Sequence, residues 1–478
     1  MCKNPKLFIT EDSMIGICAV RIKEDGTDDD SVSGRLLTWK TADLIHFTDE
    51  EILSGEKILS LHPAEQMEVD EELVKSALEY WSPVVFENLS LPKEIVVNSE
   101  KELRNTEALL TYSDGSERKK NVQWDVDGID FSKPGEYLVK GRIEQQRFKF
   151  PLAKGYGDPV IFQWEGKWYY ISTNDNLDDI GIYVREADDV HGLFDENVKE
   201  HLILPFDPVR GFEQTFWAPE FHVIGGELYI LFAVSGHSWG PQCHMMKKKK
   251  NGCITDADGW EDPVRVCRQD GTPLATDAIT LDMTYVKTER GSYLIWSYRE
   301  HIMQKNDSGS MLYIASIDEN KPWILTSEPV LLTRPLYGWE NVSGTINNEG
   351  PFAFYKDGMV YVTYSGGAAN GYTYALGLLT AKSDADLTDV RSWTKSITPV
   401  LTFRSVDGEY GPGHNAFFYN GEGELMISYH AETDISEHLR CDGIRRVHFR
   451  KDNTPYFQMS ADEDITDREV SIKVVINK

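Results

Sequence analysis

Four acidic residues and one histidine recur at nearly regular intervals along the chain. They are Asp158, Glu220, Asp282, Glu349 and His414, and successive positions are 62, 62, 67 and 65 residues apart. A single acidic residue at the start of an apolar segment usually belongs to a turn. Several carboxyl groups gathered in one place are costly, because burial and mutual repulsion disfavour their charged forms and separate their pKa values. Such a set is typical of general acid–base catalysis, in which one carboxyl group donates a proton while another accepts one.

Strand-like segments surround these positions and must hold them in place. Runs rich in β-branched and aromatic residues alternate with Gly, Asp and Asn turns, as in residues 160–173, 227–235, 292–298 and 358–365. This alternation predicts an all-β chain. Five similar units indicate a five-bladed β-propeller, in which four-stranded sheets repeat around an axis. The innermost strand of each blade runs along that axis, so we expect one residue from each unit to face a central depression.

The chain before the propeller divides into two further parts. Residues 91–148 are predicted to form a small immunoglobulin-like β-sandwich, since short strand-like runs there are separated by turn residues. Residues 1–90 are predicted to be a β-rich leading segment. Within it, residues 34–47 echo residues 372–393, because both place Ala-Asp-Leu after a strand; the echo indicates an incomplete blade. The propeller is assigned to residues 149–478.

The composition excludes several classes of partner. The 478 residues carry 49 Lys and Arg against 78 Asp and Glu, a formal charge of −29. So negative a protein repels phosphate backbones and anionic lipids, and neither nucleic acid nor a membrane is an expected partner, whereas a neutral oligosaccharide or polysaccharide is not penalised. Residues 1–10 lack the features of a signal peptide, and no apolar run reaches the roughly 18 residues of a spanning helix. We therefore expect a cytoplasmic protein, or a secreted one if a preceding segment was removed.

The six cysteines are too sparse for a disulfide framework and include no CxxC pair. Free thiols are the expectation. The cluster Cys243, His244, Cys253 and Cys267 fits no zinc template in its spacing. We expect no required cofactor, and the sequence indicates no oligomeric state.

Motifs in register with the five positions resemble glycoside hydrolase family 43. The resemblance covers about residues 150–460 and lies in five short motifs: Asp158-Pro159, Trp217-Ala218-Pro219-Glu220, Asp282, Glu349-Gly350-Pro351 and Gly411–Asn415. It implies a five-bladed propeller enzyme that inverts configuration. A second resemblance, to the bacterial immunoglobulin-like domain of group 4, lies in LTYSDGS, VQW and PGEYLVKG between residues 110 and 141.

The family resemblance implies a role for each of three acids. Asp158 corresponds to the general base, Glu349 to the general acid, and Asp282 to a third carboxyl group that raises the pKa of the acid and orients the sugar. The third unit departs from the family's pattern, and Asp277 lies only five residues away. Asp282 fits the period better, so it is preferred.

The remaining expected site residues would bind the sugar or an ion. His414 matches a histidine that in many family members helps to hold a calcium ion or an ordered water; a structural calcium and a satisfied buried histidine both stay open, because calcium prefers oxygen ligands. One of Arg445 and Arg446 is expected to reach the sugar, since successive strand residues face opposite ways. Trp217 and Trp239 are expected to stack on sugar rings. Glu220, which is expected near the three acids, is also predicted to bind the substrate.

These observations predict an inverting glycoside hydrolase acting on arabinose-containing plant polysaccharide or oligosaccharide, with α-L-arabinofuranosidase as the first expectation. The pentose preference comes from the resemblance. A β-xylosidase, an endo-arabinanase and a galactan-directed hydrolase of the same fold remain open, and so does a carbohydrate-binding propeller without activity. The presence of all three expected acids argues against the last of these.

Overall fold

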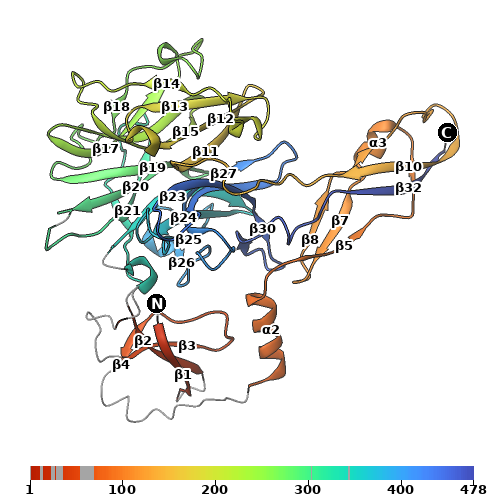
Figure 1. Ribbon diagram of the computed structural model, residues 1–478, viewed down its shortest axis with the longest axis horizontal. Coiled ribbons are helices and arrows are strands. Elements are labelled where there is room, and N and C mark those ends of the chain that lie inside the picture. Colours follow the sequence, from red (N-terminus) through yellow and green to blue (C-terminus); the bar gives the residue numbers. More distant parts are fainter. Residues whose placement is uncertain are drawn as a thin grey trace. The chain divides into compact units, whose positions relative to one another are not determined.

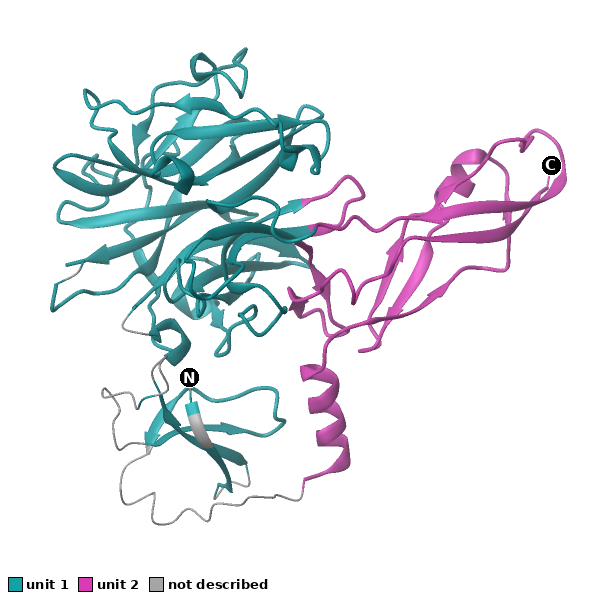
Figure 2. Cartoon of the chain, in the orientation of Figure 1, with its two compact units in different colours: residues 1–68, 149–418, 426–444 teal, residues 69–148, 419–425, 445–478 magenta. Residues whose placement is uncertain are grey.

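The computed structural model consists mainly of β-strands (Figure 1). It describes residues 2–10, 14–22, 27, 36–53, 69–302, 304–342 and 345–477. The chain divides into two compact units (Figure 2). The first comprises residues 1–68, 149–418 and 426–444, and the second comprises residues 69–148, 419–425 and 445–478.

The first unit holds five consecutive sheets whose strands follow chain order. Blade I consists of β11 (Tyr156–Trp164), β12 (Lys167–Asn174), β13 (Ile182–Ala187) and β14 (His201–Leu204). Blade II consists of β15 (Gln214–Ile224), β16 (Glu227–Gly236), β17 (Trp239–Lys247) and β18 (Val264–Arg265). Blade III consists of β19 (Ala278–Thr288), β20 (Gly291–Glu300), β21 (Met311–Ile317) and β22 (Val330–Thr333). Blade IV consists of β23 (Asn348–Lys356), β24 (Met359–Gly366), β25 (Ala375–Lys382) and β26 (Thr394–Lys395), and blade V of β27 (Tyr410–Tyr419), β28 (Leu425–Glu432) and β29 (Arg440–Arg446).

The first strands of neighbouring blades lie against one another. β11 contacts β15, β15 contacts β19, and β19 contacts β23. Apolar side chains fill the space between adjacent blades; Leu231 of blade II packs with Met283 and Trp296 of blade III, for example. The predicted five-bladed propeller is confirmed. Short 3-10 helices occur in its connections, at Asp175–Leu177, Gly192–Phe194, Ala257–Gly259, Gly338–Glu340 and Val390–Ser392.

The second unit contains two small sheets and two helices. One sheet has the order β5 (Phe86–Ser90), β7 (Ala108–Tyr112), β8 (Glu117–Lys120), and the other has the order β6 (Glu94–Val97), β32 (Arg468–Ile476), β10 (Gly135–Ile143), β9 (Gln123–Trp124). The helices are α2 (Glu71–Trp81) and α3 (Glu100–Arg104), and a further strand pair is formed by β30 (His448–Phe449) and β31 (Pro455–Tyr456).

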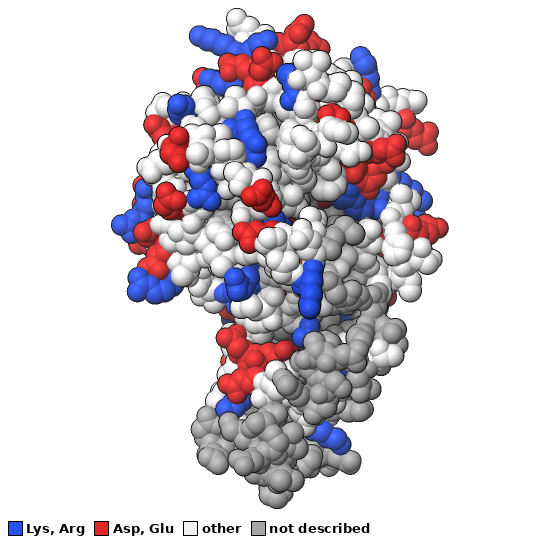
Figure 3. Space-filling view, turned by 90° about the vertical axis from the view of Figure 1, so that its left-hand side faces the viewer, with Lys and Arg blue, Asp and Glu red and all other residues white. Residues whose placement is uncertain are grey.

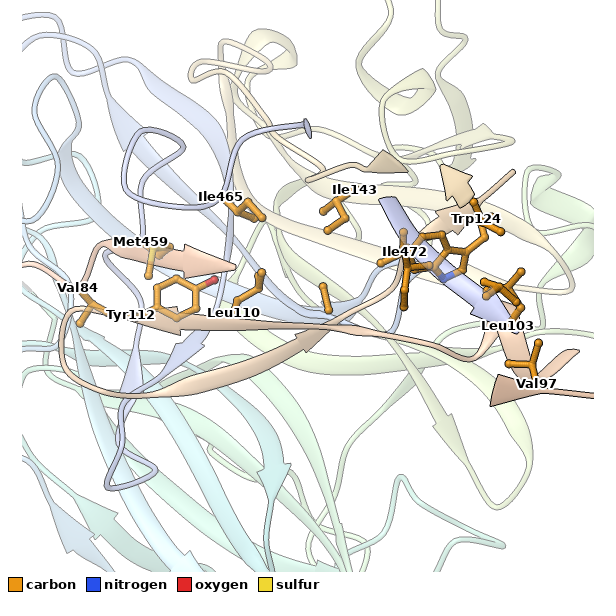
Figure 4. Packing of buried hydrophobic residues seen from close by; sticks show 14 of the residues in the cluster. Val84, Val97, Leu103, Leu110, Tyr112, Trp124, Ile143, Met459, Ile465 and Ile472 are labelled. Carbon is orange, nitrogen blue, oxygen red and sulfur yellow. The ribbon is translucent and has the colours of Figure 1, made fainter. Parts of the chain in front are cut away.

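The last strand of the chain belongs to this second unit and not to the propeller. β32 pairs along its whole length with β10. Its Ile472 packs in one core with Leu110, Trp124 and Ile143 (Figure 4). The predicted propeller range of 149–478 is therefore too long at its end. Exposure alternates from residue to residue along 468–476, with Ile472, Val474 and Ile476 buried, as in a strand on a half-buried sheet, and no motif in the sequence linked that strand to the earlier segment.

The leading segment forms a four-stranded sheet of its own. Its strands β1 (Cys2–Ile9), β2 (Ile15–Arg21), β3 (Leu36–Thr41) and β4 (Glu51–Leu53) pair in chain order, as the strands of a blade do. Phe8 and Cys18 are buried together against Leu36. Residues 54–68 of the predicted segment 1–90 lie outside the described residues, and residues 69–90 belong to the second unit.

Acidic and basic side chains are interspersed over the described surface that Figure 3 shows. Among the helices that the structure describes, none is long and apolar enough to cross a membrane.

Candidate active site

The first strand of every blade contains a residue with left-handed backbone at an equivalent point. These residues are Asp158 (φ 61°), Ala218 (φ 45°), Asp282 (φ 50°), Gly350 (φ 56°) and His414 (φ 43°). In blades I to IV the pairing with the second strand shifts register there, as a β-bulge causes. Four of the five are not glycine, and a left-handed non-glycine residue carries strain that is usually kept where it directs a side chain at a functional site.

A cavity of about 960 Å³ opens at these bulges. Each of the five blades contributes one predicted site residue to its lining: Asp158, Trp217, Asp282, Glu349 and His414. The three acids are only 5, 3 and 9% exposed. The cavity therefore gathers carboxyl groups from blades I, III and IV in an environment that water reaches poorly.

A guanidinium group, an imidazole ring and a hydroxyl group surround the carboxylate of Asp158. Its Oδ2 accepts from Thr173 Oγ1 at 2.5 Å, and its Oδ1 lies 3.1 Å from both Arg440 Nη1 and His414 Nδ1. Burial alone would raise the pKa of Asp158, but His414 and Arg440 hold it well below its usual range. Asp158 is therefore ionised at neutral pH, which is the state that a general base requires.

Glu349 has the opposite electrostatic character. Burial, and after it the charge of the neighbouring Asp282, raise its pKa to about 8. Its Oε1 accepts from Tyr374 OH at 2.9 Å. Burial raises the pKa of Asp282 as well, so the two carboxyl groups titrate as a pair that keeps one proton near neutral pH. Asp282 Oδ2 accepts from Ser297 Oγ at 3.0 Å and from the N–H of Gly350 at 3.2 Å, which favours ionised Asp282 and leaves the proton on Glu349.

Two motif glycines make room for these contacts. A Cβ atom at Gly157 would lie 2.2 Å from Cζ of Arg440, so any side chain there would push the guanidinium away from Asp158. A Cβ atom at Gly350 would lie 2.9 Å from the ring of His414. The small residues beside the acids in the sequence are thus needed for close packing around them.

His430, on β28, ties the proposed base to a loop of blade IV. The N–H of Asp158 lies 3.2 Å from His430 Nδ1, and His430 Nε2 lies 3.1 Å from the carbonyl oxygen of Ala369. His430 Nδ1 also lies 3.3 Å from Asp158 Oδ1. Burial lowers the pKa of His430, which favours its neutral form. The ring also stacks on Tyr374, with centroids 5.5 Å apart, and so connects the surroundings of Asp158 with those of Glu349.

Glu220 is outside the described lining of the cavity, contrary to the expectation that it binds substrate. It follows the bulge of blade II by two residues, and its Oε2 lies 2.6 Å from His222 Nε2. Burial raises the pKa of Glu220 well above its usual range and lowers that of His222 to about 3. Both side chains are therefore uncharged near neutral pH, and Glu220 donates a hydrogen bond to the imidazole. The regular spacing of the acids concealed this difference in position.

Trp239, Arg445 and Arg446 are also outside the described cavity lining, so the structure does not bring them together with the three acids. The ring of Trp239 packs near His244, with centroids 5.9 Å apart. Arg445 and Arg446 are buried in the second unit, where Arg446 Nε donates to Asp464 Oδ2 at 2.6 Å. Both arginines lie at the end of β29, whereas the residue of this strand that lines the cavity lies at the start of the strand.

That residue is Arg440, and it was not predicted. Arg440 and Arg299 both line the cavity. Two bonds from Arg299 to Asp307, at 2.8 and 2.7 Å, fix its guanidinium. The place of Arg440 at the cavity could have been inferred from the order of the strands, because the start of β29 lies near the end of β28, which carries His430.

His414, beside which the sequence leaves a calcium ion open, has a buried Nε2 atom without a hydrogen-bond partner in the described part of the chain. Calcium takes six to eight oxygen ligands, and the part of the chain that the structure describes contains no group of three or more His, Cys, Asp or Glu side chains placed to hold a metal. His414 Nδ1 instead faces Asp158.

Comparison with known proteins identifies two families in the chain. Residues 151–455 match the model of glycosyl hydrolases family 43, and residues 88–146 match that of the bacterial Ig-like domain (group 4). The crystal structure of an α-L-arabinofuranosidase from Lactobacillus brevis is similar with a TM-score of 0.57 and 28% identity, covering 64% of this chain and 95% of that one.

Two curated relatives are 30% identical to this chain. An extracellular exo-α-(1→5)-L-arabinofuranosidase of Streptomyces avermitilis matches over 67% of this chain and 65% of its own length, and α-L-arabinofuranosidase B of Pyricularia oryzae over 64% and 62%. The chain thus spans somewhat less than two thirds of either relative. A relative from Streptomyces chartreusis is also named extracellular. These names overturn the cytoplasmic location expected from the sequence.

The family model covers well over half of the chain, and its match coincides with the propeller that holds the acids. The chain belongs to glycosyl hydrolase family 43, with a bacterial Ig-like domain of group 4 ahead of the family domain.

Proposed function

We propose that this chain is an inverting α-L-arabinofuranosidase acting outside the cell on arabinose-containing plant polysaccharide or oligosaccharide, without a cofactor. The observation that carries the proposal is the opposite perturbation of two carboxyl groups in one cavity: the pKa of Asp158 is held low, while that of Glu349 is raised to about 8. The names of the arabinofuranosidases that it resembles support the choice of arabinose.

The acid and base act together in this mechanism. Ionised Asp158 removes a proton from a water molecule as the water oxygen attacks the anomeric carbon of the sugar. The bond between that carbon and the departing oxygen breaks, and the departing oxygen takes the proton of Glu349. One water is consumed, and the sugar is released with inverted configuration. Proton transfer from Asp158 back to Glu349 through solvent restores the starting state.

Asp282 is a positioning residue in this scheme. Its negative charge lies beside Glu349 and keeps the proton on that side chain until the glycosidic oxygen arrives. Arg440 and His414 beside Asp158 have the complementary effect, since they lower its pKa and keep the base ionised in the same poorly hydrated cavity.

A panel of aryl glycosides tests the substrate class. We expect release of nitrophenol from the α-L-arabinofuranoside and little from the β-D-xyloside or β-D-galactoside, with ¹H NMR showing β-L-arabinofuranose as the first product. Cleavage of the xyloside instead would identify a β-xylosidase, and cleavage of internal linkages in linear arabinan an endo-arabinanase. Sugar binding without cleavage of any glycoside would identify a non-catalytic propeller.

Two variants test the roles of the acids. Glu349→Gln should abolish cleavage of arabino-oligosaccharides but retain part of the activity on aryl glycosides, whose leaving groups need little protonation. Asp158→Asn should abolish cleavage of both kinds of substrate. Equal losses on the two substrate kinds for Glu349→Gln would contradict its role as the acid.

A further inference from the structure

The loop after β12 is bent sharply and reaches the cavity. Asp178 and Asp179 are consecutive left-handed residues, with φ of 53° and 57°, and Gly181 follows with φ of 88°. Left-handed backbone is unfavourable for a residue with a side chain, so two in succession indicate that the loop is held in this shape by its contacts. The N–H of Asp179 donates to the carbonyl oxygen of Asn174 at 3.1 Å, and its own carbonyl oxygen accepts from the N–H of Phe216 at 3.0 Å.

The bent loop places the carboxyl group of Asp179 at the cavity beside Trp217. Asp179 Oδ2 accepts from Trp217 Nε1 at 2.8 Å. Asp179 Oδ1 is fully buried and has no hydrogen-bond partner in the described part of the chain. A buried carboxylate oxygen without a donor is costly, so this atom is expected to meet a donor when the cavity is filled.

The carboxyl group of Asp179 lies beside one acid, Asp175, and one cation, Arg440. The neighbouring acid, Asp175, receives the guanidinium of Arg440 through Nε at 2.9 Å and through Nη2 as well. Burial raises the pKa of Asp179 to about 6, with Trp217 opposing the change and Asp175 adding to it. Above that pH the carboxylate is an acceptor only, and sugar hydroxyl groups are donors.

We propose that Asp179 determines sugar specificity by accepting, through Oδ1, a hydrogen bond from a hydroxyl group of the sugar ring that packs against Trp217. The inference rests on the proposed function and deepens it. It predicts a preference for sugars that carry a free ring hydroxyl at that point over deoxy or O-substituted sugars, because a deoxy sugar would leave Oδ1 buried and unpaired.

A cycle of variants and deoxy substrates tests this assignment. The substrates are aryl α-L-arabinofuranosides lacking the 2-, 3- or 5-hydroxyl group. The variant Asp179→Asn can keep an oxygen toward Trp217 while it places an NH₂ group at the position of Oδ1, and asparagine tolerates the left-handed backbone. Asp178→Asn is the matched control, since Asp178 is exposed and has a similar φ.

Asp179→Asn should lower kcat/KM for the full sugar about 10- to 100-fold, the range of a lost charge-assisted hydrogen bond. For one of the three deoxy substrates, that loss should nearly vanish. Equal losses on the full sugar and all three deoxy substrates, or no loss on any of them, would overturn the proposal. Asp178→Asn should change none of these values. If Asp179→Asn does not fold, Asp179→Gly removes the carboxyl group and adopts φ of 57° without strain.

The proposed function and this inference fail in different ways. If the wild-type protein cleaves a β-D-xyloside instead, the proposed arabinofuranosidase function fails, and the cycle is carried out with deoxyxylosides to decide the role of Asp179. If it cleaves no glycoside, both proposals are overturned.

Discussion

Replacing Asp282 with asparagine should move the alkaline side of the pH–rate profile to lower pH. The general acid must be protonated, so kcat/KM falls as pH rises through the pKa of Glu349, which is about 8 here against an ordinary 4.5. Burial raises this pKa most, and the charge of Asp282 contributes next. Asparagine removes that charge but keeps an oxygen for the bonds from Ser297 and Gly350.

The expected size follows from the usual strength of a close charge pair, about 1–3 pKa units. A decrease of about 2 units would leave Glu349 with a pKa near 6, and its protonated fraction at pH 7 would fall from about nine-tenths to about one-tenth. At pH 7, kcat/KM should therefore drop about tenfold through this effect, and much of the loss should disappear at about pH 5.

The assay measures kcat/KM for an arabino-oligosaccharide between about pH 4 and 9, because its departing oxygen needs a proton. Asp277→Asn is the control: Asp277 is exposed, lies five residues away, and should leave the profile unchanged. A profile for Asp282→Asn that is lowered equally at every pH, with its alkaline side unmoved, would refute the argument that Asp282 sets the pKa of Glu349.

Three further substitutions test the structure around and away from the cavity. Gly157→Ala should lower kcat about 10-fold or more by displacing Arg440, with little change in the fold by circular dichroism; unchanged steady-state kinetics would contradict the tight packing at this position. Glu220→Gln should change kcat/KM less than about threefold and the thermal midpoint little, because Glu220 is already uncharged; a loss like that of Asp158→Asn would show that Glu220 takes part in the reaction. Arg446→Leu should destabilise the second unit by about 1.5–3 kcal/mol in urea unfolding, because it removes a charge-assisted hydrogen bond to the buried carboxylate of Asp464 and leaves Arg118, 3.6 Å away, as its remaining cation. Burial would raise the pKa of Asp464, but Arg446 holds it well below its usual range, so this stabilisation is present above the unfolded carboxyl pKa of about 3.9 and disappears as pH falls further; equal stability of variant and wild type at neutral pH would contradict it.

The repeat in the sequence located three acids of the cavity because each stands at or next to a bulge. The period favoured Asp282 over Asp277, and the structure places Asp282 in the cavity lining. The period could not distinguish Glu220, which follows its bulge by two residues and pairs with a histidine. It also carried no information on Arg440, which comes from the third strand of its blade, where no motif marks the end nearest the cavity.

The five left-handed positions explain how one repeated position came to hold different chemistry in each blade. The left-handed residue is an acid in blades I and III and a histidine in blade V. In blade IV it is Gly350, which allows His414 to approach closely and lets the acid occupy the preceding residue. In blade II it is Ala218, whose N–H donates to Thr173 Oγ1 at 2.8 Å. That hydroxyl in turn donates to Asp158, so even the bulge without a polar side chain contributes a hydrogen bond that stabilises the ionised base.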